Sequence, residues 1–346
     1  MKKYIFIISL TFIACQEEIT LDLPQANNQL VVEGAIESGY PPYVILTKNQ
    51  GYFDEINAST YNSLFVYDAD SIKVWYEENN QKIIRYLSLI PIEISENLFS
   101  IPFPVYTVTD ISDTSELSGN YNFSQSGRTY FLEIKWNNKI ITSSTTIPEP
   151  TPLDCLWVEK NETAEKEHKC DIRAILSDDG SVKNNIIVKS KRLEHWRKDT
   201  TTGEATNKPD EMLSIIDAGT DVLFNGEAFE TYFPRPNDNG FPTGKWSSDR
   251  YAKWENNNIT DSIFLKHDVA LIKFCQIDEA SLKFWRSLVR QFGTNGNPFA
   301  EPMNLVGNIN NGLGVWTGYG AVYYKVPIIK QSVIYQQYKP SIIDIF

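Results

Sequence analysis

The chain has 346 residues, and its 44 acidic residues outnumber the 32 basic ones, for a formal net charge of −12. A strongly acidic chain repels phosphate backbones, so the composition argues against a nucleic-acid partner. The length exceeds the ~250–300 residues at which a single hydrophobic core stops growing, so we expect two domains.

Residues 1–14 are predicted to form a signal peptide. Lys2 and Lys3 precede an apolar run of eleven residues from Tyr4 to Ala14. As a helix this run reaches about 16 Å, against a hydrocarbon core of ~30 Å. It is therefore too short to cross a bilayer and fits the apolar region of a secretory signal.

Cys15 stands where the apolar run ends. Ile13, Ala14 and Cys15 resemble the lipobox of bacterial lipoproteins, with Phe12 in place of the usual leucine. In such proteins the leader is removed and the cysteine becomes the first residue, carrying fatty-acyl chains such as palmitate. One chain holds a protein weakly on a membrane, whereas two or three hold it firmly. We expect lipidation of Cys15; the alternative is a chance cysteine beside a simple cleavage site.

Gln16, Glu17 and Glu18 follow the cysteine directly. This acidic cluster resembles the export signal that places some Bacteroidota lipoproteins on the outer leaflet of the outer membrane. In the alternative interpretation, residues 15–27 are only a polar, flexible, lipidated tether. We expect a lipid-anchored protein of the outer membrane that faces the cell exterior rather than inward.

Residues 28–147 are predicted to form an immunoglobulin-like antiparallel β-sandwich. β-branched runs occur at 29–37 and 42–49, around the turn-forming segment SGYPP. Two further pairs of runs, at 71–90 and 127–148, each surround an Asn-Asn pair and are expected to be hairpins. Strands at this spacing with short polar turns are typical of a sandwich.

The prolines of TIPEPTPLD interrupt this pattern, because proline donates no ladder hydrogen bond and stiffens the chain. We therefore place a domain boundary at residue 148 and expect a second β-rich domain over residues 148–346. Its expected strands lie at 170–178, 184–193, 264–276 and 314–329. Apolar residues at spacings of three and four also predict one prominent helix near 278–292, with Asp278 as N-cap and Gly293 as its stop.

The stretch 207–261 is predicted to form loops, and loops on a rigid β scaffold often carry binding sites. It is rich in aromatic and polar residues, and exposed aromatic faces with polar neighbours stack on sugars or grip a peptide. The alternative is that these rings pin the loops onto the sheet. The candidate ligand-binding residues are Phe233, Phe241, Trp246, Tyr251 and Trp254.

We expect no catalytic residues, no cofactor and no metal site. The three histidines, His168, His195 and His267, lie far apart in the sequence without metal-ligand spacing. No serine stands in a G-x-S-x-G motif. The segment SDDGS at 177–181 lacks a full EF-hand pattern, so we interpret it as a turn.

Three cysteines remain after Cys15, and an exported protein permits disulfides. Cys155 and Cys170 are close enough in sequence to close a small loop, which would leave Cys275 unpaired. Buried free thiols are the alternative, and the sequence does not choose between the two.

Taken together, four segments resemble domain-of-unknown-function family 4249, a group of Bacteroidota lipoproteins. They are the leader ending in AC, the run QLVVEGAIESGYPPYVILTKNQGYF, the mid-chain TTIPEPTPLD and the late run NPFAEPMNLVGNINNGLGVWTGYGAVYY. The resemblance covers essentially the whole mature chain, and residues 297–324 are its most specific part. Members are commonly encoded beside TonB-dependent outer-membrane receptors, so the resemblance implies a receptor-associated role at the surface. It implies no catalytic residue and no ligand, and only Cys15 carries over by position.

The expected function is that of a non-catalytic outer-membrane surface lipoprotein. It would be accessory to a TonB-dependent receptor barrel or would bind a nutrient such as a peptide or glycan. A surface hydrolase with paired carboxylates within 207–261 is one alternative, because carboxylates are abundant and such a pair is defined by separation in space. A structural or adhesive surface protein, marked by a large exposed apolar patch, is the other.

Overall fold

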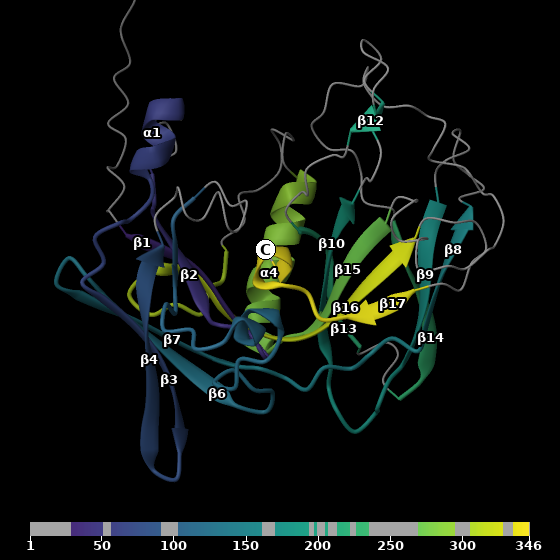
Figure 1. Ribbon diagram of the computed structural model, residues 1–346, viewed down its shortest axis with the longest axis horizontal. Helices are drawn as coiled ribbons and strands as arrows, with labels where there is room; N and C mark the ends of the chain where they lie inside the picture. The colour runs from purple at the N-terminus through teal and green to yellow at the C-terminus, as the bar shows by residue number, and fades with distance from the viewer. Residues whose placement is uncertain are drawn as a thin grey trace, which may run out of the picture.

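The computed structural model describes residues 29–50, 57–90, 103–160, 170–193, 197–198, 205–206, 213–221, 226–234, 269–294, 305–327 and 335–345. Within these ranges the chain is all-β with one prominent helix, as predicted (Figure 1). No helix in this part of the chain is long and apolar enough to span a bilayer. The predicted signal peptide, Cys15 with its acidic neighbours, and the three histidines lie outside the described residues.

The described N-terminal half contains two hairpins that the sequence predicts. Asn79 and Asn80 have φ angles of 51° and 60°, and Asn137 and Asn138 have φ angles of 49° and 58°. Two consecutive residues with positive φ make the type I′ turn that matches the twist of the flanking strands. The strands of this half are β1 (Leu30–Glu37), β2 (Tyr43–Lys48), β3 (Ser71–Glu78), β4 (Gln81–Ile90), β5 (Val105–Thr107), β6 (Thr129–Trp136) and β7 (Lys139–Thr146), with the short helix α1 (Ala58–Ser63) after β2.

The sheet of this half curls around one hydrophobic core. The long strand β4 pairs with both β3 and β5, so it carries the sheet from one layer to the other. Tyr130, Leu132 and Ile134 of β6 point into the core, as the two-residue period of a strand predicts. On the opposite side of the core, β1 and β2 contribute Val32 and Leu46.

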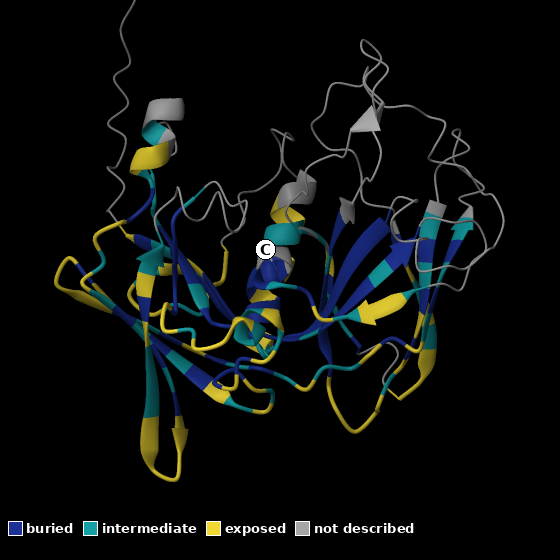
Figure 2. Cartoon of the chain, viewed as in Figure 1, coloured by how far each residue is buried: buried dark blue, intermediate teal, exposed yellow. Residues whose placement is uncertain are grey.

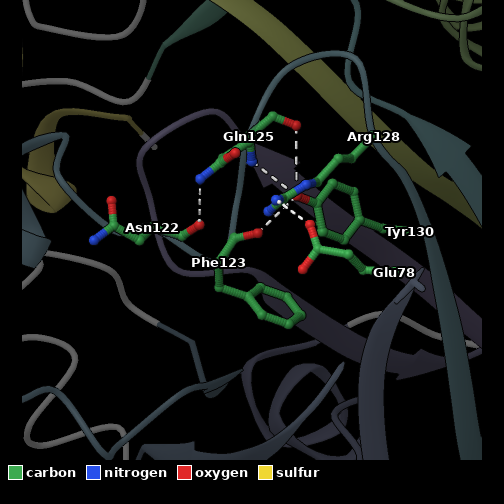
Figure 3. A network of polar contacts seen from close by, with 6 residues as sticks. All are labelled: Glu78, Asn122, Phe123, Gln125, Arg128 and Tyr130. Atoms are coloured by element: carbon green, nitrogen blue, oxygen red, sulfur yellow. Dashed lines mark hydrogen bonds and ion pairs between the residues drawn. The ribbon is translucent and has the colours of Figure 1, made fainter. Parts of the chain in front are cut away.

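Tyr130 closes this core near the start of β6 (Figure 3). Its hydroxyl donates to the carbonyl of Phe123 and accepts from the backbone N–H of Gln125, both at 2.7 Å. Arg128 beside it pairs with Glu78 of β3 at 3.2 Å. A tyrosine that bonds back to the chain a few residues upstream is similar to the tyrosine corner of immunoglobulin-like sandwiches. The immunoglobulin-like type itself stays a prediction.

The described C-terminal half is a pair of packed sheets. The small sheet has the order β14-β9-β8, and it lies against the β13-β10-β15-β16 part of the large sheet, on the right of Figure 1. Figure 2 shows that β10, β15 and β16 are the most deeply buried of these strands. The strands of this half are β8 (Cys155–Lys160), β9 (Cys170–Ser177), β10 (Asn185–Leu193), β13 (Ser214–Thr220), β14 (Ala228–Pro234), β15 (Val269–Gln276), β16 (Leu313–Pro327) and β17 (Gln336–Tyr338). Two further short strands, β11 (Arg197–Lys198) and β12 (Ala205–Thr206), pair with each other.

Strand β16 joins the two halves. Its first part pairs with β1 in parallel, and its second part pairs with β15 in antiparallel fashion, so the large sheet is mixed rather than purely antiparallel. The segment with the prolines crosses β16 closely, since a Cβ on Gly318 would lie 2.5 Å from the carbonyl oxygen of Thr146, and one on Gly320 would lie 2.2 Å from that of Pro148. The domain division at residue 148 stays a prediction.

Helix α4 (Glu279–Thr294) packs on the large sheet between the two halves (Figure 1). It begins as predicted, because Asp278 Oδ1 accepts from the N–H of Ser281 at 2.8 Å. The other oxygen, Oδ2, accepts from the hydroxyl of Thr145 at 2.6 Å and so ties the helix to β7. Trp285 of the predicted apolar stripe is buried against the sheet. The helix runs one residue beyond the predicted stop at Gly293.

The expectation of loops throughout 207–261 is wrong for two segments, which form β13 and β14. These strands stand at the ends of their sheets, and their inward faces are only partly apolar. A period-two signal is weak in such strands, which explains the error.

The register of β8 and β9 excludes a bridge between Cys155 and Cys170. Cys155 pairs with Ile175, and Cys170 pairs with Lys160 at the other end of the ladder. Five residues along a strand separate their Cα atoms by about 16 Å, whereas a disulfide needs less than ~7 Å. Cys155 and Cys275 are free thiols.

Candidate functional site

A cavity of about 490 Å³ opens between the two sheets of the C-terminal half. It lies where β13, at the end of the large sheet, faces β14, at the end of the small sheet. Its volume falls in the ~300–1,000 Å³ range of small-molecule sites. The apolar part of its wall consists of Leu176, Ile186, Val188, Phe229, Phe233 and Phe274.

Strand β13 supplies a polar strip to the wall. Asp217, Gly219 and Asp221 all line the cavity, because alternate residues of an extended chain face the same side. Val188 lies opposite Asp217 and Ile186 lies opposite Gly219 on the neighbouring β10, which places these apolar side chains beside the strip. A Cβ added to Gly219 would have no heavy atom within 4 Å, so the middle of the strip is open space.

Strand β14 supplies the facing wall. Phe229, Thr231 and Phe233 alternate along it and all line the cavity. Phe233 is buried and belongs to the hydrophobic core between the sheets. The facing wall is therefore aromatic, with one hydroxyl between two rings.

Both carboxylates of the strip are held by backbone N–H groups. Asn184 donates its N–H to Asp221 Oδ2 at 2.6 Å, and Asp221 is 2% exposed. Ala218 donates its N–H to Asp217 Oδ1 at 2.7 Å. A carboxylate offers about four acceptor positions, so each retains capacity for a ligand donor.

The predicted turn SDDGS borders this end of the sandwich and ties its two sheets together. Asp178 accepts from the side-chain amide of Asn184 at 2.7 Å and from the N–H of Gly226 at 2.8 Å. Asp179 accepts from the N–H and hydroxyl of Ser181, and these hydrogen bonds lower the pKa of Asp179. These carboxylates serve the turn, and no trio of potential metal ligands occurs among the described residues.

Tyr232 and Arg173 flank the cavity on the outer side of the small sheet. Tyr232 is 58% exposed, and the Arg173 guanidinium lies 5.7 Å from the centre of its ring. The positive charge of Arg173 is balanced by Glu230 at 3.1 Å and Glu159 at 3.4 Å. Arg173 is therefore not a free cation beside the cavity.

A second polar cluster lies on the opposite face of the large sheet, where the two halves meet. Lys273 and Glu37 form a buried ion pair at 2.5 Å, and Lys273 lies 4.6 Å from the ring centre of Tyr319. Burial, together with the charge of Lys273, lowers the pKa of Lys189 to about 8. Burial raises the pKa of Cys275 to about 12, which keeps this thiol protonated and unreactive. This cluster joins β1 to β15 and serves the fold.

Of the five predicted ligand-binding aromatics, the structure places Phe233 in the cavity wall. Phe241, Trp246, Tyr251 and Trp254 lie outside the described residues, so their role stays a prediction. Sequence reasoning missed Asp217, Asp221 and the other wall residues. The alternation of Phe229, Thr231 and Phe233 in AFETYFP is a signal for the β14 wall. It carries no information about Asp217 and Asp221.

Comparison with known proteins gives one family. The model of the family described as Domain of unknown function (DUF4249) matches residues 16–324. No curated protein matches the chain. The matched range includes every strand that lines the cavity and most of β16, which joins the two halves. The chain therefore belongs to the DUF4249 family.

Proposed function

We propose that this protein is a non-catalytic outer-membrane surface lipoprotein that binds an apolar group of a nutrient, such as a peptide side chain, in the cavity between β13 and β14. The observation that carries the proposal is the cavity itself, with about 490 Å³, an apolar interior and a polar strip on one wall. This combination is typical of sites where apolar contacts give affinity and a few polar groups give orientation. A peptide side chain fits the interior better than a sugar, because buried hydroxyl groups without partners cost free energy.

Binding accounts for the two carboxylates better than hydrolysis does. Asp217 and Asp221 are four residues apart along an extended chain, so their Cα atoms are about 13 Å apart. Catalytic carboxyl pairs of glycosidases stand ~5–9.5 Å apart. Each of the two is also fixed by a backbone N–H, at 2.7 Å and 2.6 Å. Such fixed carboxylates suit the orientation of a bound ligand.

The anchor at Cys15 supports a role beside a membrane partner. Acylation would confine the protein to the plane of the outer membrane, which raises its effective concentration near a TonB-dependent receptor barrel without new contacts. The protein would then hold a ligand close to the transporter that takes it up.

Filling the cavity tests the binding proposal. N-phenyl-1-naphthylamine is a neutral apolar dye that fluoresces in dry pockets, and the full mature chain with Cys15→Ala avoids detergent. We expect saturable, one-to-one enhancement of its fluorescence. Gly219→Leu places a side chain in the open space of the strip, so it should weaken dye binding at least tenfold. Ser144→Leu adds the same side chain at an exposed position of β7 and should leave binding unchanged.

Dye binding that is absent, or equal in Gly219→Leu and its control, would show that the cavity is not a binding site.

The membrane part of the proposal has a separate test, which compares wild type with Cys15→Ala in membrane fractions. We expect wild type to sediment with outer membranes and to carry a receptor barrel in a gentle-detergent pull-down. A Cys15→Ala variant that still sediments with membranes would contradict the anchor.

A further inference from the structure

We propose that the cavity takes an organic cation, with an apolar body between the sheets and an ammonium group at the Asp217–Asp221 strip. This inference rests on the proposed binding function and adds the chemical class of the ligand. The same chemistry occurs in free alkyl or aryl amines and in the lysine side chain of a peptide. The two sources share one recognition mode and are separated by experiment.

The ionisable groups of the wall have one sign. Among the lining residues that the structure describes, Asp217 and Asp221 carry negative charge, and neither lysine, arginine nor histidine is present. Asp221 is 2% exposed, so its charge is screened little by water and acts strongly on a ligand placed in the cavity. A carboxylate ligand would meet repulsion there, and a neutral one would gain nothing from the charge.

The nearby positive charges do not change this sign. Arg173 is paired with both Glu159 and Glu230. Lys183, in the turn before β10, lies 3.9 Å from Glu279. Asp178 adds negative charge next to Asn184. The charges that the structure describes around the cavity are therefore negative overall, and a negative field raises the local concentration of cations.

The strip has room for a charged head between its two carboxylates. Gly219 stands between Asp217 and Asp221 on the same side of β13, and a Cβ there would meet nothing within 4 Å. An ammonium group has three donors and no acceptor, so it can donate to the free acceptor positions of one carboxylate while the other, about 13 Å away along the strand, adds to the negative field. The rings of Phe229 and Phe233 face the strip, and aromatic faces attract cations.

The interior of the cavity determines the apolar part of the ligand. The two sheets contribute aliphatic side chains from β9 and β10 and aromatic ones from β14 and β15. Each methylene buried there is expected to raise affinity roughly fourfold. An amine with a chain of about six carbons combines both contributions, whereas ammonium alone lacks the apolar one.

Displacement of the bound dye separates charge from apolarity. The probes are n-hexylamine, 1-hexanol and hexanoate, which share one chain length and carry positive, zero and negative charge at pH 7. We expect n-hexylamine to displace the dye at least tenfold more tightly than 1-hexanol, and hexanoate to be the weakest. Asp217→Asn and Asp221→Asn keep the shape and the backbone hydrogen bonds, and together they should bring n-hexylamine within about threefold of 1-hexanol. Asp179→Asn removes the same charge from the neighbouring turn and should change little.

The outcomes separate the two proposals. If the dye binds but 1-hexanol or hexanoate equals n-hexylamine, the cavity is a binding site and the cation inference is overturned. If the dye does not bind in a cavity-dependent way, both proposals fail.

An acetylated peptide amide with a central lysine is the second arm of the displacement experiment, and it separates the two sources of the amine. Displacement by n-hexylamine alone assigns the site to free amines, and displacement by the peptide extends it to lysine side chains.

Discussion

In the N-terminal half, β7 returns to β16 and the core is enclosed, whereas in the C-terminal half β13 and β14 face each other across a cavity. The return of β7 rests on Thr145, whose hydroxyl accepts from the N–H of Gly318 at 2.8 Å. The adjoining Ser143 donates its hydroxyl to the carbonyl of Asn308 at 2.8 Å. Strands β13 and β14 belong to different sheets, and about 490 Å³ remains between them.

The difference shows how one chain can use similar sheets for two purposes. A curled sheet that closes on itself has all of its inner face packed. The volumes of its inward side chains must therefore fill the core without gaps. A sandwich with two unjoined end strands leaves space along one side, so its end strands tolerate aspartate and glycine on the inner face. On the inner face, β13 carries Asp217 and Gly219, whereas β6 carries Tyr130 and Leu132.

The largest expected effect concerns the joint between the halves, by which we mean the buried polar cluster of Glu37, Lys189, Lys273 and Cys275. Glu37→Ala would leave the buried ammonium of Lys273 without its partner, and such a loss costs ~3–5 kcal/mol in the free energy of unfolding. Chemical denaturation of wild type and variant measures it. The double variant Glu37→Leu, Lys273→Met removes both charges and should recover most of the loss. A cost below ~1 kcal/mol for Glu37→Ala would mean that water reaches the pair.

Two glycines, one in each half, test the contrast in packing. A Cβ on Gly34 of β1 would lie 2.7 Å from the Trp316 ring, so Gly34→Val should lose about 2–3 kcal/mol by overpacking. Gly219→Val extends into open space and restricts the unfolded chain, so it should gain about 0.5–1 kcal/mol. Denaturation midpoints of the two variants check the signs. Equal losses at both positions would remove the distinction between a packed and an open half.

The tyrosine near the start of β6 tests how the N-terminal core is closed. Tyr130→Phe removes the hydroxyl that bonds to Phe123 and Gln125. The buried carbonyl of Phe123 and the part-buried N–H of Gln125 lose that partner, at a cost of about 1–2 kcal/mol. Tyr86→Phe is the matched control, because Tyr86 is 64% exposed, and it should change stability by less than ~0.5 kcal/mol. Urea denaturation followed by tryptophan fluorescence compares the two. If both changes were neutral, the hydroxyl of Tyr130 would not secure the loop.

The elements that sequence reasoning predicted well are those whose structure depends on local pattern. The Asn-Asn turns, the alternation of β6 and the N-cap at Asp278 follow from backbone geometry and hydrogen bonding within a few residues. The parallel pairing of β1 with β16 joins residues almost three hundred positions apart, and no local pattern specifies it.

The candidate site was predicted only in part, for a physical reason. Phe233 was identified through its aromatic neighbourhood, but Asp217 and Asp221 were not. A strand that faces a cavity shows neither the apolar alternation of a core strand nor the polar alternation of a surface strand. Which carboxylates meet at one cavity is decided by the pairing of β13 with β10, which the sequence does not display.

The smallest expected effect is a pH dependence at the joint. Burial lowers the pKa of Lys189 from 10.5 to about 8. Between these two values the unfolded chain binds a proton that the folded chain does not, so this lysine makes the free energy of unfolding rise with pH over that window. Cys275 acts in the opposite sense, because burial raises its pKa from 9.0 to about 12 and the unfolded thiol ionises first. The contribution of Lys189 must therefore be isolated by difference.

Lys189→Met is the variant that isolates it, because methionine keeps the apolar stem of the side chain and removes the charge. The stability of wild type relative to Lys189→Met should be lowest and constant below pH 8 and should rise as the pH approaches 10.5. Denaturation curves at closely spaced pH values measure this difference. Lys139→Met, at an exposed position of β7, should retain the pH slope of wild type. A difference that falls with pH would mean that the folded state prefers the charged form of Lys189, and that its electrostatic attraction to Glu33 and Glu37 outweighs burial at the joint.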